Sequence, residues 1–389
     1  MEEWKEYKLG EIINVLDYKR VPLSAKERST RKGIYPYYGA QGIIDYVDDY
    51  IFDGTYLLIA EDGENLKSQK QNIAQLASGR YWVNNHAHIV ENNNRSDLRY
   101  ICYLLNSLDI SGYITGSAQP KLNQANLVNI SVHIPPLETQ QKIASILSAL
   151  DDKIEVNRKI SENLEQQAQA LFKSWFVDFE PFKNGEFVES ELGMIPKGWR
   201  VGKLSEIADY VNGLAMQKFR PQNNEQGLPV LKIKELGQGY FDANTEQCSP
   251  SLVGEKYIIH DGDIIFSWSG TLMVKIWCGG LCGLNQHLFV VVPNNYPKWF
   301  VYLWTLYHLD NFIRIAKDKA VTMGHIKRGE LDKAYVTIPN KEEMEKCNAL
   351  IAPIYKQIIS NELESRRLAH LRDTLLPKLM SGELKVNEL

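Results

Sequence analysis

The sequence lacks the features of a membrane protein and of a disulfide-stabilised secreted domain. Its apolar runs are short, and the one from Leu288 to Val292 is typical, whereas a membrane-spanning helix needs 18 or more apolar residues. The first residues are acidic without an apolar segment, so we expect no signal peptide. Cysteine is scarce, with five residues in 389. This odd number favours free thiols in a reducing, cytoplasmic compartment.

An excess of charge of one sign is also missing. The chain has 44 Lys and Arg against 48 Asp and Glu, a formal net charge of −4. This balance argues against a general polyanion-binding surface, but it does not exclude a focused nucleic-acid site.

Recognisable catalytic and metal-binding motifs are absent as well. Gly193 to Gly198 has the glycine spacing of a phosphate-binding loop, but Trp199 follows where lysine is required. No Ser-His-Asp or Cys-His set stands out, and the only Pro-Pro, at 135–136, lacks the Asn or Asp of an adenine methyltransferase. Cys278 with Cys282, and His86 with His88, are each only half of a metal site. We therefore predict no catalytic residues, no metal and no cofactor.

What the sequence does contain is an internal repeat. The motif Trp-x3-Lys-Leu-x-Glu-Ile at Trp4 recurs at Trp199, 195 residues later. The segment Val132 to Pro135 matches Val336 to Pro339 at an offset of 204. Because the matches keep the same order, a duplicated chain explains them best.

A long helical segment follows each Ile-Pro pair. Apolar residues step by four and three from Ile143, and from Cys347 at an offset of 204, which is a heptad seam. The predicted seam residues are Ile154, Asn157, Leu164, Leu171, Ile358, Asn361, Leu368 and Leu375. Antiparallel pairing about a pseudo-twofold axis would bring Asn157 and Asn361 face to face. The alternative is two ordinary helices that belong to separate cores.

These patterns predict an α+β protein with two mixed α/β globular domains, separated by two long antiparallel coiled-coil helices. We expect the first globular domain at residues 1–136, the first helix at 137–180 and a connector rich in Pro, Gly and Glu at 181–198. The second globular domain covers 199–340. The second helix and a tail cover 341–389.

Three segments resemble a known family. The stretch from Leu171 to Phe182, continued by Leu192 to Trp199, is similar to the central region of the specificity subunit of type I restriction-modification systems. Ile134 to Ala144 resembles the entry to that family's first helix, and Leu375 to Leu384 resembles its C-terminal end. The resemblance covers nearly the whole chain.

The resemblance implies a division of labour. Each globular half would be a target recognition domain that reads one half of a split double-stranded DNA site. The helices would be a spacer and would dock two modification subunits. Those subunits would bind S-adenosylmethionine and methylate adenine, and ATP-dependent restriction subunits would cleave unmodified DNA. Two other readings stay open from the residues alone, a coiled-coil scaffold without a DNA role and an enzyme with an unrecognised site.

The expected DNA contacts combine loop position with chemistry. Amides and Arg read base edges, basic groups hold phosphates, and aromatic rings stack on bases. The alternative for such residues is packing within turns. In the first half the candidates are Tyr38, Gln41, Arg80, Trp82, Asn85, His86, Gln119 and Lys121. In the second half they are Lys232, Lys234, Trp268, Ser269, Gln286, His287, Thr322 and His325.

Overall fold

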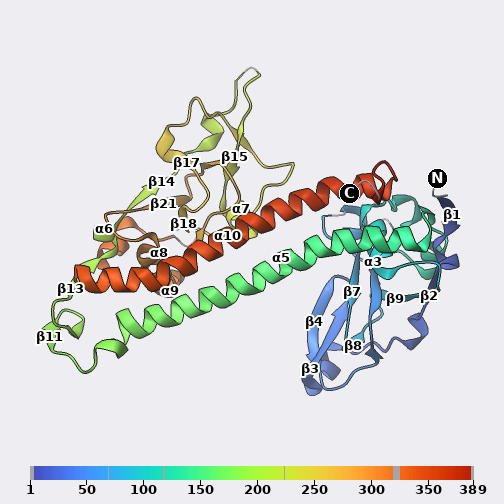
Figure 1. Ribbon diagram of the computed structural model, residues 1–389, viewed down its shortest axis with the longest axis horizontal. Helices are drawn as coiled ribbons and strands as arrows, with labels where there is room; N and C mark the ends of the chain where they lie inside the picture. The colour runs from blue at the N-terminus through green and yellow to red at the C-terminus, as the bar shows by residue number, and fades with distance from the viewer. Residues whose placement is uncertain (1–3, 69, 117–118, 223, 319–324, 387–389) are drawn as a thin grey trace. The chain divides into compact units, whose positions relative to one another are not determined.

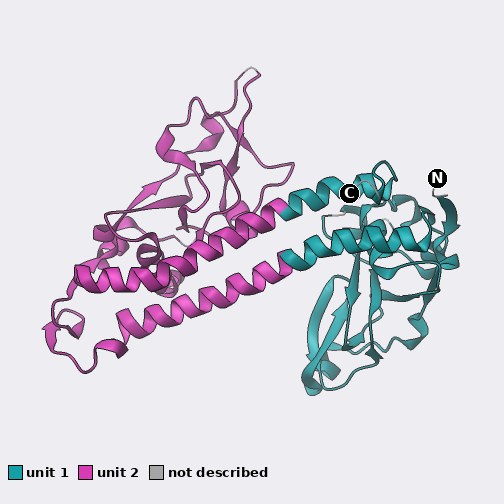
Figure 2. Cartoon of the chain, viewed as in Figure 1, with its two compact units in different colours: residues 1–153, 368–389 teal, residues 154–367 magenta. Residues whose placement is uncertain are grey.

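The computed structural model describes residues 4–68, 70–116, 119–222, 224–318 and 325–386 (Figure 1). The chain forms two compact units (Figure 2). Unit 1 comprises residues 1–153 and 368–389, and unit 2 comprises residues 154–367. Each long helix therefore contributes to both units, whereas the sequence suggested separate helical segments. Among the described residues, no helix combines the length and the apolar character needed to cross a membrane.

Unit 1 contains two four-stranded sheets and a strand pair. The first sheet has the order β2-β9-β6-β7 and consists of β2 (Ile13–Val15), β9 (Ala87–Asn92), β6 (Tyr56–Ala60) and β7 (Ala74–Ala77). The second has the order β4-β3-β8-β5 and consists of β4 (Gly42–Val47), β3 (Lys32–Gly39), β8 (Arg80–Val83) and β5 (Phe52–Asp53). The antiparallel pair is β1 (Lys5–Lys8) with β10 (Ser131–Ile134).

The short helices of unit 1 are α1 (Ala25–Thr30), α2 (Asn65–Ser68), α3 (Leu98–Ser107) and α4 (Gln124–Val128). Among them, α3 packs on the first sheet and α1 lies against β4 of the second. Asp97 caps α3, because its carboxylate accepts a hydrogen bond from Tyr100 N at 2.9 Å. Tyr100, Ile101 and Leu104 then recur on one face and are buried with Leu57 of β6.

Unit 2 repeats this arrangement. Its first sheet has the order β14-β21-β18-β19 and consists of β14 (Ala208–Asn212), β21 (Leu288–Pro293), β18 (Ile264–Ser267) and β19 (Met273–Ile276). Its second has the order β16-β15-β20-β17 and consists of β16 (Gln247–Cys248), β15 (Leu228–Leu231), β20 (Cys282–Leu284) and β17 (Ile258–Ile259). Two further antiparallel pairs are β13 (Arg200–Lys203) with β22 (Tyr335–Ile338), and β11 (Phe187–Ser190) with β12 (Gly193–Pro196) in the segment expected as a connector. Its helices are α6 (Leu204–Ile207), α7 (Ile233–Gln238), α8 (Lys298–Tyr307) and α9 (Leu309–Asp318).

The two strand orders match one to one. In both units the two middle strands of the second sheet pair in parallel, β3 with β8 and β15 with β20. Every pairing in the first sheets is antiparallel. The repeat seen in the sequence is thus a repeat of the whole domain fold.

The two long helices are α5 (Leu137–Phe172) and α10 (Lys341–Met380). Asn340 caps α10 by accepting a hydrogen bond from Glu343 N at 3.0 Å. Within unit 2 the helices run antiparallel, because Asn157 lies beside Ser365 while Ser161 lies beside Asn361. Within unit 1, Asp151 of α5 pairs with Arg372 of α10 at 2.6 Å.

The seam asparagines face each other, as the sequence predicted. Asn157 Nδ2 donates to Ser365 Oγ at 3.3 Å, and Asn361 Nδ2 donates to Ser161 Oγ at 3.3 Å. These contacts are equivalent, since 361 and 365 are 157 and 161 plus the repeat offset of 204. Asn157 Nδ2 also donates to Glu364 Oε2 at 2.7 Å. The polar pair therefore specifies one alignment of the two helices.

The predicted seam drifts at the end of α5. Leu171 is half-buried, whereas the neighbouring Phe172 is buried against Trp304, with ring centroids 4.9 Å apart. Ala168, Phe172 and Phe176 recur every four residues, and Lys173–Val177 forms a π-helical turn. Steps of four exceed the 3.5-residue heptad period, so the buried position moves to Phe172.

Candidate nucleic-acid interface

In unit 1, the loop after β6, the loop before β9 and the segment that holds Lys121 bring four polar side chains together. Asp62, just after β6, forms an isolated β-bridge with Lys121. Its carboxylate lies 2.6 Å from His86 Nδ1, and Lys121 Nζ lies 3.1 Å from Glu61 Oε1. The side chains of His86 and Lys121 are about half exposed, at 49% and 50%. Lys121 therefore presents donor groups to the surface, and His86 presents the ring nitrogen that does not face Asp62.

A charged network lies beneath this surface. The Arg20 guanidinium contacts Glu61 at 2.6 Å and Asp17 at 3.1 Å. His88 is buried, with Nδ1 2.6 Å from Asp17 Oδ2 and Nε2 2.7 Å from the Leu122 carbonyl oxygen. Burial acts to raise the pKa of Glu61, but hydrogen bonds from Arg20 and Lys121 and the nearby His88 outweigh it and lower that pKa.

The same network engages the ligand atoms of its acidic cluster. Ligand atoms of Asp17, Glu61 and His88 lie within 4.8 Å of one another. Both nitrogens of His88 face oxygen atoms of neighbouring residues, a carboxylate and a carbonyl, within hydrogen-bond distance. Arg20 already supplies the positive charge between the two carboxylates.

The equivalent place in unit 2 is built from aromatic residues. Ser269, just after β18, forms an isolated β-bridge with His325, and its hydroxyl lies 3.0 Å from His287 Nδ1. Trp268 Nε1 donates to Asn212 Oδ1 at 2.9 Å. The Trp268 ring lies against Phe289, with centroids 5.7 Å apart.

A surface depression of about 460 Å³ opens over these rings. We call it the Trp268 depression. It is lined by Asn212, Trp268, Phe289, His325, Ile326, Lys327 and Arg328. The Arg328 guanidinium lies 5.7 Å from the centroid of the Phe289 ring. The depression thus combines an apolar floor with a cationic rim.

The sheet registers align the two sites position by position. Since Ala60 pairs with Ala87 and Ser267 with Leu288, Glu61 and Asp62 correspond to Trp268 and Ser269. The matching β-bridges align Lys121 with His325. By the same registers, the remaining pairs are His86 with His287, His88 with Phe289, and Asp17 with Asn212. One place in the fold therefore carries charges in unit 1 and aromatic rings in unit 2.

Comparison with known proteins identifies the family. The family model for the type I restriction modification DNA specificity domain matches residues 1–166 and 196–372, one match for each half. The chain belongs to this family. The MjaIX specificity subunit of Methanocaldococcus jannaschii is 33% identical over 305 residues, which are 75% of this chain and 70% of the relative. The HindI specificity subunit of Haemophilus influenzae is 25% identical and aligns with 99% of this chain and 100% of its own length.

The fold comparison agrees with the family. The crystal structure of a type I restriction-modification S subunit from M. genitalium superposes with a TM-score of 0.61 at 16% identity. It covers 97% of this chain and 96% of its own. The expected fold class, two mixed domains with two long helices, is confirmed.

Several of the DNA-contact candidates predicted from the sequence lie in or beside these two equivalent sites. His86 and Lys121 in unit 1, and Trp268, Ser269, His287 and His325 in unit 2, belong to them. Gln41 lies in the exposed β3–β4 turn beside Gly63. Asn85 is exposed and precedes His86, and Gln286 contacts His287 at 3.3 Å. Gln119 is exposed two residues before Lys121, and Thr322 lies outside the described residues.

The other candidates are engaged elsewhere in the units. Trp82 is a core residue, because it is 5% exposed and its Nε1 donates to the Val21 carbonyl at 2.6 Å. Tyr38 is half-buried, and burial raises the pKa of its hydroxyl. Arg80 pairs with Asp53 at 3.0 Å. Lys232 and Lys234 pair with Glu246 and Asp242, each at 2.6 Å.

Sequence reasoning missed Asp17, Arg20 and Glu61 in unit 1, and Asn212, Phe289 and Arg328 in unit 2. Phe289 and Arg328 lie only two and three residues from candidates His287 and His325, whereas Asp17, Arg20 and Asn212 come from segments far in sequence from the candidate loops. Charge and aromatic content gave no local signal, because the residues meet only when the first sheet forms.

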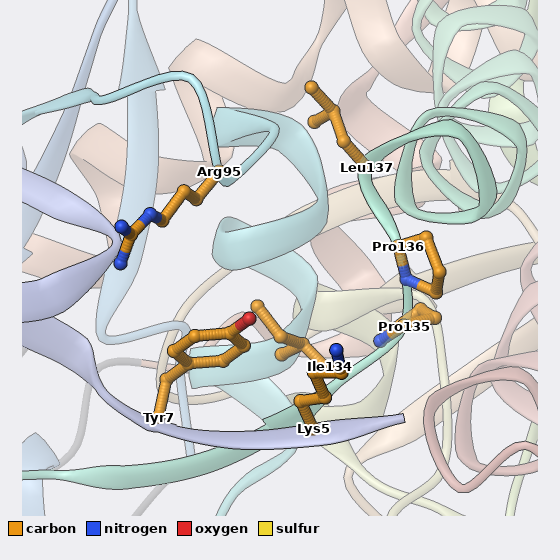
Figure 3. Close-up of a pocket in the computed structure, with 7 residues that line it drawn as sticks. All are labelled: Lys5, Tyr7, Arg95, Ile134, Pro135, Pro136 and Leu137. Carbon is orange, nitrogen blue, oxygen red and sulfur yellow. The ribbon is translucent and has the colours of Figure 1, made fainter. Parts of the chain in front are cut away.

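Unit 1 has a concavity of its own, which lies where β10 leads into α5 (Figure 3). It measures about 290 Å³, and Lys5, Tyr7, Arg95, Ile134, Pro135, Pro136 and Leu137 line it. Two cations therefore border an apolar wall there. At the equivalent strand pair of unit 2, Arg200 donates to Tyr296 Oη at 2.9 Å.

Proposed function

We propose that this chain is the sequence-reading subunit of a type I restriction-modification complex, and that each unit reads one half of a split DNA site. The observation that carries the proposal is the pair of equivalent sites, one around the Asp62–Lys121 bridge of unit 1 and one around the Ser269–His325 bridge of unit 2. The same fold occurs twice, and the same loop positions carry different side chains in each copy. This is what recognition of two unlike half-sites requires, because base-edge patterns are distinguished by the chemistry of the contacting groups.

In unit 1 the recognition chemistry is polar. Lys121 exposes donors, His86 exposes a ring nitrogen, and the ion pairs below hold the loops that carry them. Base-edge acceptors and phosphate oxygens are suitable partners for such donors. The overall charge of −4 supplies no general attraction to DNA. Affinity must therefore come from these local sites and from partner subunits.

The proposal assigns the chemical steps to partners. The paired helices α5 and α10 would act as the spacer and as the dock for two modification subunits. S-adenosylmethionine and adenine methylation would belong to those subunits, and ATP and cleavage to restriction subunits. The family membership supports this assignment, since the relatives are themselves named specificity subunits.

Methylation-site sequencing tests the proposal. A host that expresses this chain with its modification subunits should acquire methylated adenines in one two-part motif with a fixed gap. Replacing residues 199–340 with the equivalent domain of a relative should change one part of the motif only. An unsplit motif, or a change in both parts, would contradict the proposal.

A scaffold without a DNA role is the competing reading. A gel shift on random DNA with the assembled complex separates the two. Omission of this chain should abolish sequence-selective retention while the modification subunits remain present. Equal selectivity without it would favour the scaffold.

A further inference from the structure

We infer that the Trp268 depression of unit 2 reads a thymine through its 5-methyl group, and that unit 1 does not read its half-site in this way. The inference rests on the proposed function and adds the chemistry of one contact.

The polar atoms of Asn212 and Trp268 in the floor are already engaged. Asn212 accepts from Trp268 Nε1 at 2.9 Å, and its Nδ2 donates to the Gly213 carbonyl at 3.3 Å. His287 lies next to the Trp268 ring outside the lining, and its Nδ1 is 3.0 Å from Ser269 Oγ and its Nε2 3.3 Å from Gln286. The floor, as distinct from the polar rim of His325, Lys327 and Arg328, therefore has little capacity to read a base by hydrogen bonds.

What the floor offers instead is apolar surface. Phe289 and Ile326 are each 3% exposed and form its base, and the half-buried ring of Trp268 forms its wall. On the major-groove edges of the four base pairs, the thymine methyl is the one apolar group. Chemical complementarity thus selects an A·T pair.

The rim supplies the charge that a DNA ligand needs. Lys327 and Arg328 line the depression. Arg328 is oriented by a hydrogen bond to the Tyr210 carbonyl at 3.1 Å. An adjoining concavity of about 550 Å³ shares Asn212 and Arg328 and adds Lys256. Cations beside an apolar floor fit a base flanked by its phosphates better than an uncharged ligand.

Unit 1 provides an internal contrast. Glu61 stands at the Trp268 position and His88 at the Phe289 position. The Arg20 side chain is 15% exposed and contacts the carboxylates of Glu61 and Asp17. A methyl group placed there would displace ion pairs without apolar contacts in return.

Deoxyuridine substitution tests the inference, because it removes only the methyl group. After methylation-site sequencing defines the motif, each thymine of both half-sites is replaced in turn, and binding of the assembled complex is measured. At one thymine of the second half-site we expect about fourfold weaker binding, the value of one buried methyl group. In Trp268→Ala this ratio should fall to about one, and Trp268→Phe should give an intermediate ratio.

The first half-site is the matched control. Its deoxyuridine ratios should be the same in the wild type and in both variants, which also shows that the variants fold and assemble. The inference is overturned by a second half-site without an A·T pair, by ratios near one at all its thymines, or by a ratio that persists in Trp268→Ala. Absence of any split motif would instead overturn the proposed function.

Discussion

At the residue scale, His88 and Phe289 show how one fold position can serve two chemistries. Both follow the same kind of turn. In unit 1 the buried Asn84 accepts a hydrogen bond from the backbone N–H of His86 at 2.8 Å, and in unit 2 the buried Asn285 accepts one from His287 at 3.3 Å. The backbone is held in the same way in both units. The side chains beyond the turn are therefore free to differ without changing the fold.

Lys121→Ala tests the polar site of unit 1. The ammonium group is half exposed, so it contributes long-range attraction to phosphates. We expect weaker binding to all DNA sequences, a salt dependence reduced by about one counterion, and an unchanged motif. Binding titrations at several salt concentrations measure this. Lys8→Ala, whose Nζ donates to Ser131 on the β1–β10 pair, is the control, and an equal change there would argue against a local role.

Glu61→Gln tests the buried network through its pH dependence. The lowered pKa of Glu61 means that its stabilising contribution is present above its ordinary value of 4.5 and is lost as pH falls through the lowered value. At pH 7 the variant should lose about 2 kcal/mol, because Arg20 and Lys121 lose a charged acceptor. Hydrogen exchange of peptides from β6 and β9 measures this loss. The difference between wild type and variant should shrink in acid, and a constant difference would contradict the assignment.

At the element scale, the helix seam was the most predictable feature of the chain. Heptad spacing and the polar positions Asn157 and Asn361 could be predicted, because residues seven apart lie on the same face of a coiled-coil helix. The drift from Leu171 to Phe172 was not readable. It depends on a π-helical turn and on the aromatic cluster around Trp304, which comes from a segment more than 100 residues away.

Asn157→Ala tests the register role of the seam. Asn157 is 1% exposed and donates to Glu364 and Ser365. Its loss should destabilise unit 2 by about 1–3 kcal/mol, because buried partners lose a hydrogen bond. Arg158→Ala, an exposed neighbour with ion pairs to Glu155 and Glu162, should change stability by less than about 0.5 kcal/mol. Thermal unfolding compares the two, and similar losses would count against a special role of the seam.

At the scale of the whole molecule, the chain is two copies of one recognition fold joined by helices that both units share. The division falls at residues 153/154 in α5 and 367/368 in α10. An insertion at these two points leaves the internal contacts of each unit unchanged. This makes the helices a testable determinant of the gap in the DNA site.

Inserting one seven-residue repeat at both points should lengthen that gap. Seven helical residues add about 10 Å, or about three base pairs at 3.4 Å each. Methylation-site sequencing should show both half-sites unchanged and a longer gap. Insertion into α5 alone is the control and should impair methylation, because helices of unequal length cannot keep both the Asp151–Arg372 pair of unit 1 and the Asn157–Ser365 contact of unit 2. An unchanged gap after the double insertion would rule out the spacer role.

The sequence by itself determined the duplication, the α+β class, the two long helices and the seam asparagines. These are repeated or periodic features, and periodicity is visible in one dimension. Only the tertiary structure decided which loop residues form a site. Asp17, Glu61 and His88 in unit 1, and Asn212, Trp268 and Phe289 in unit 2, come together because sheet register aligns strands distant in sequence. The alternating pattern of each strand constrains its register, but which distant strands become neighbours is decided only when the whole sheet packs.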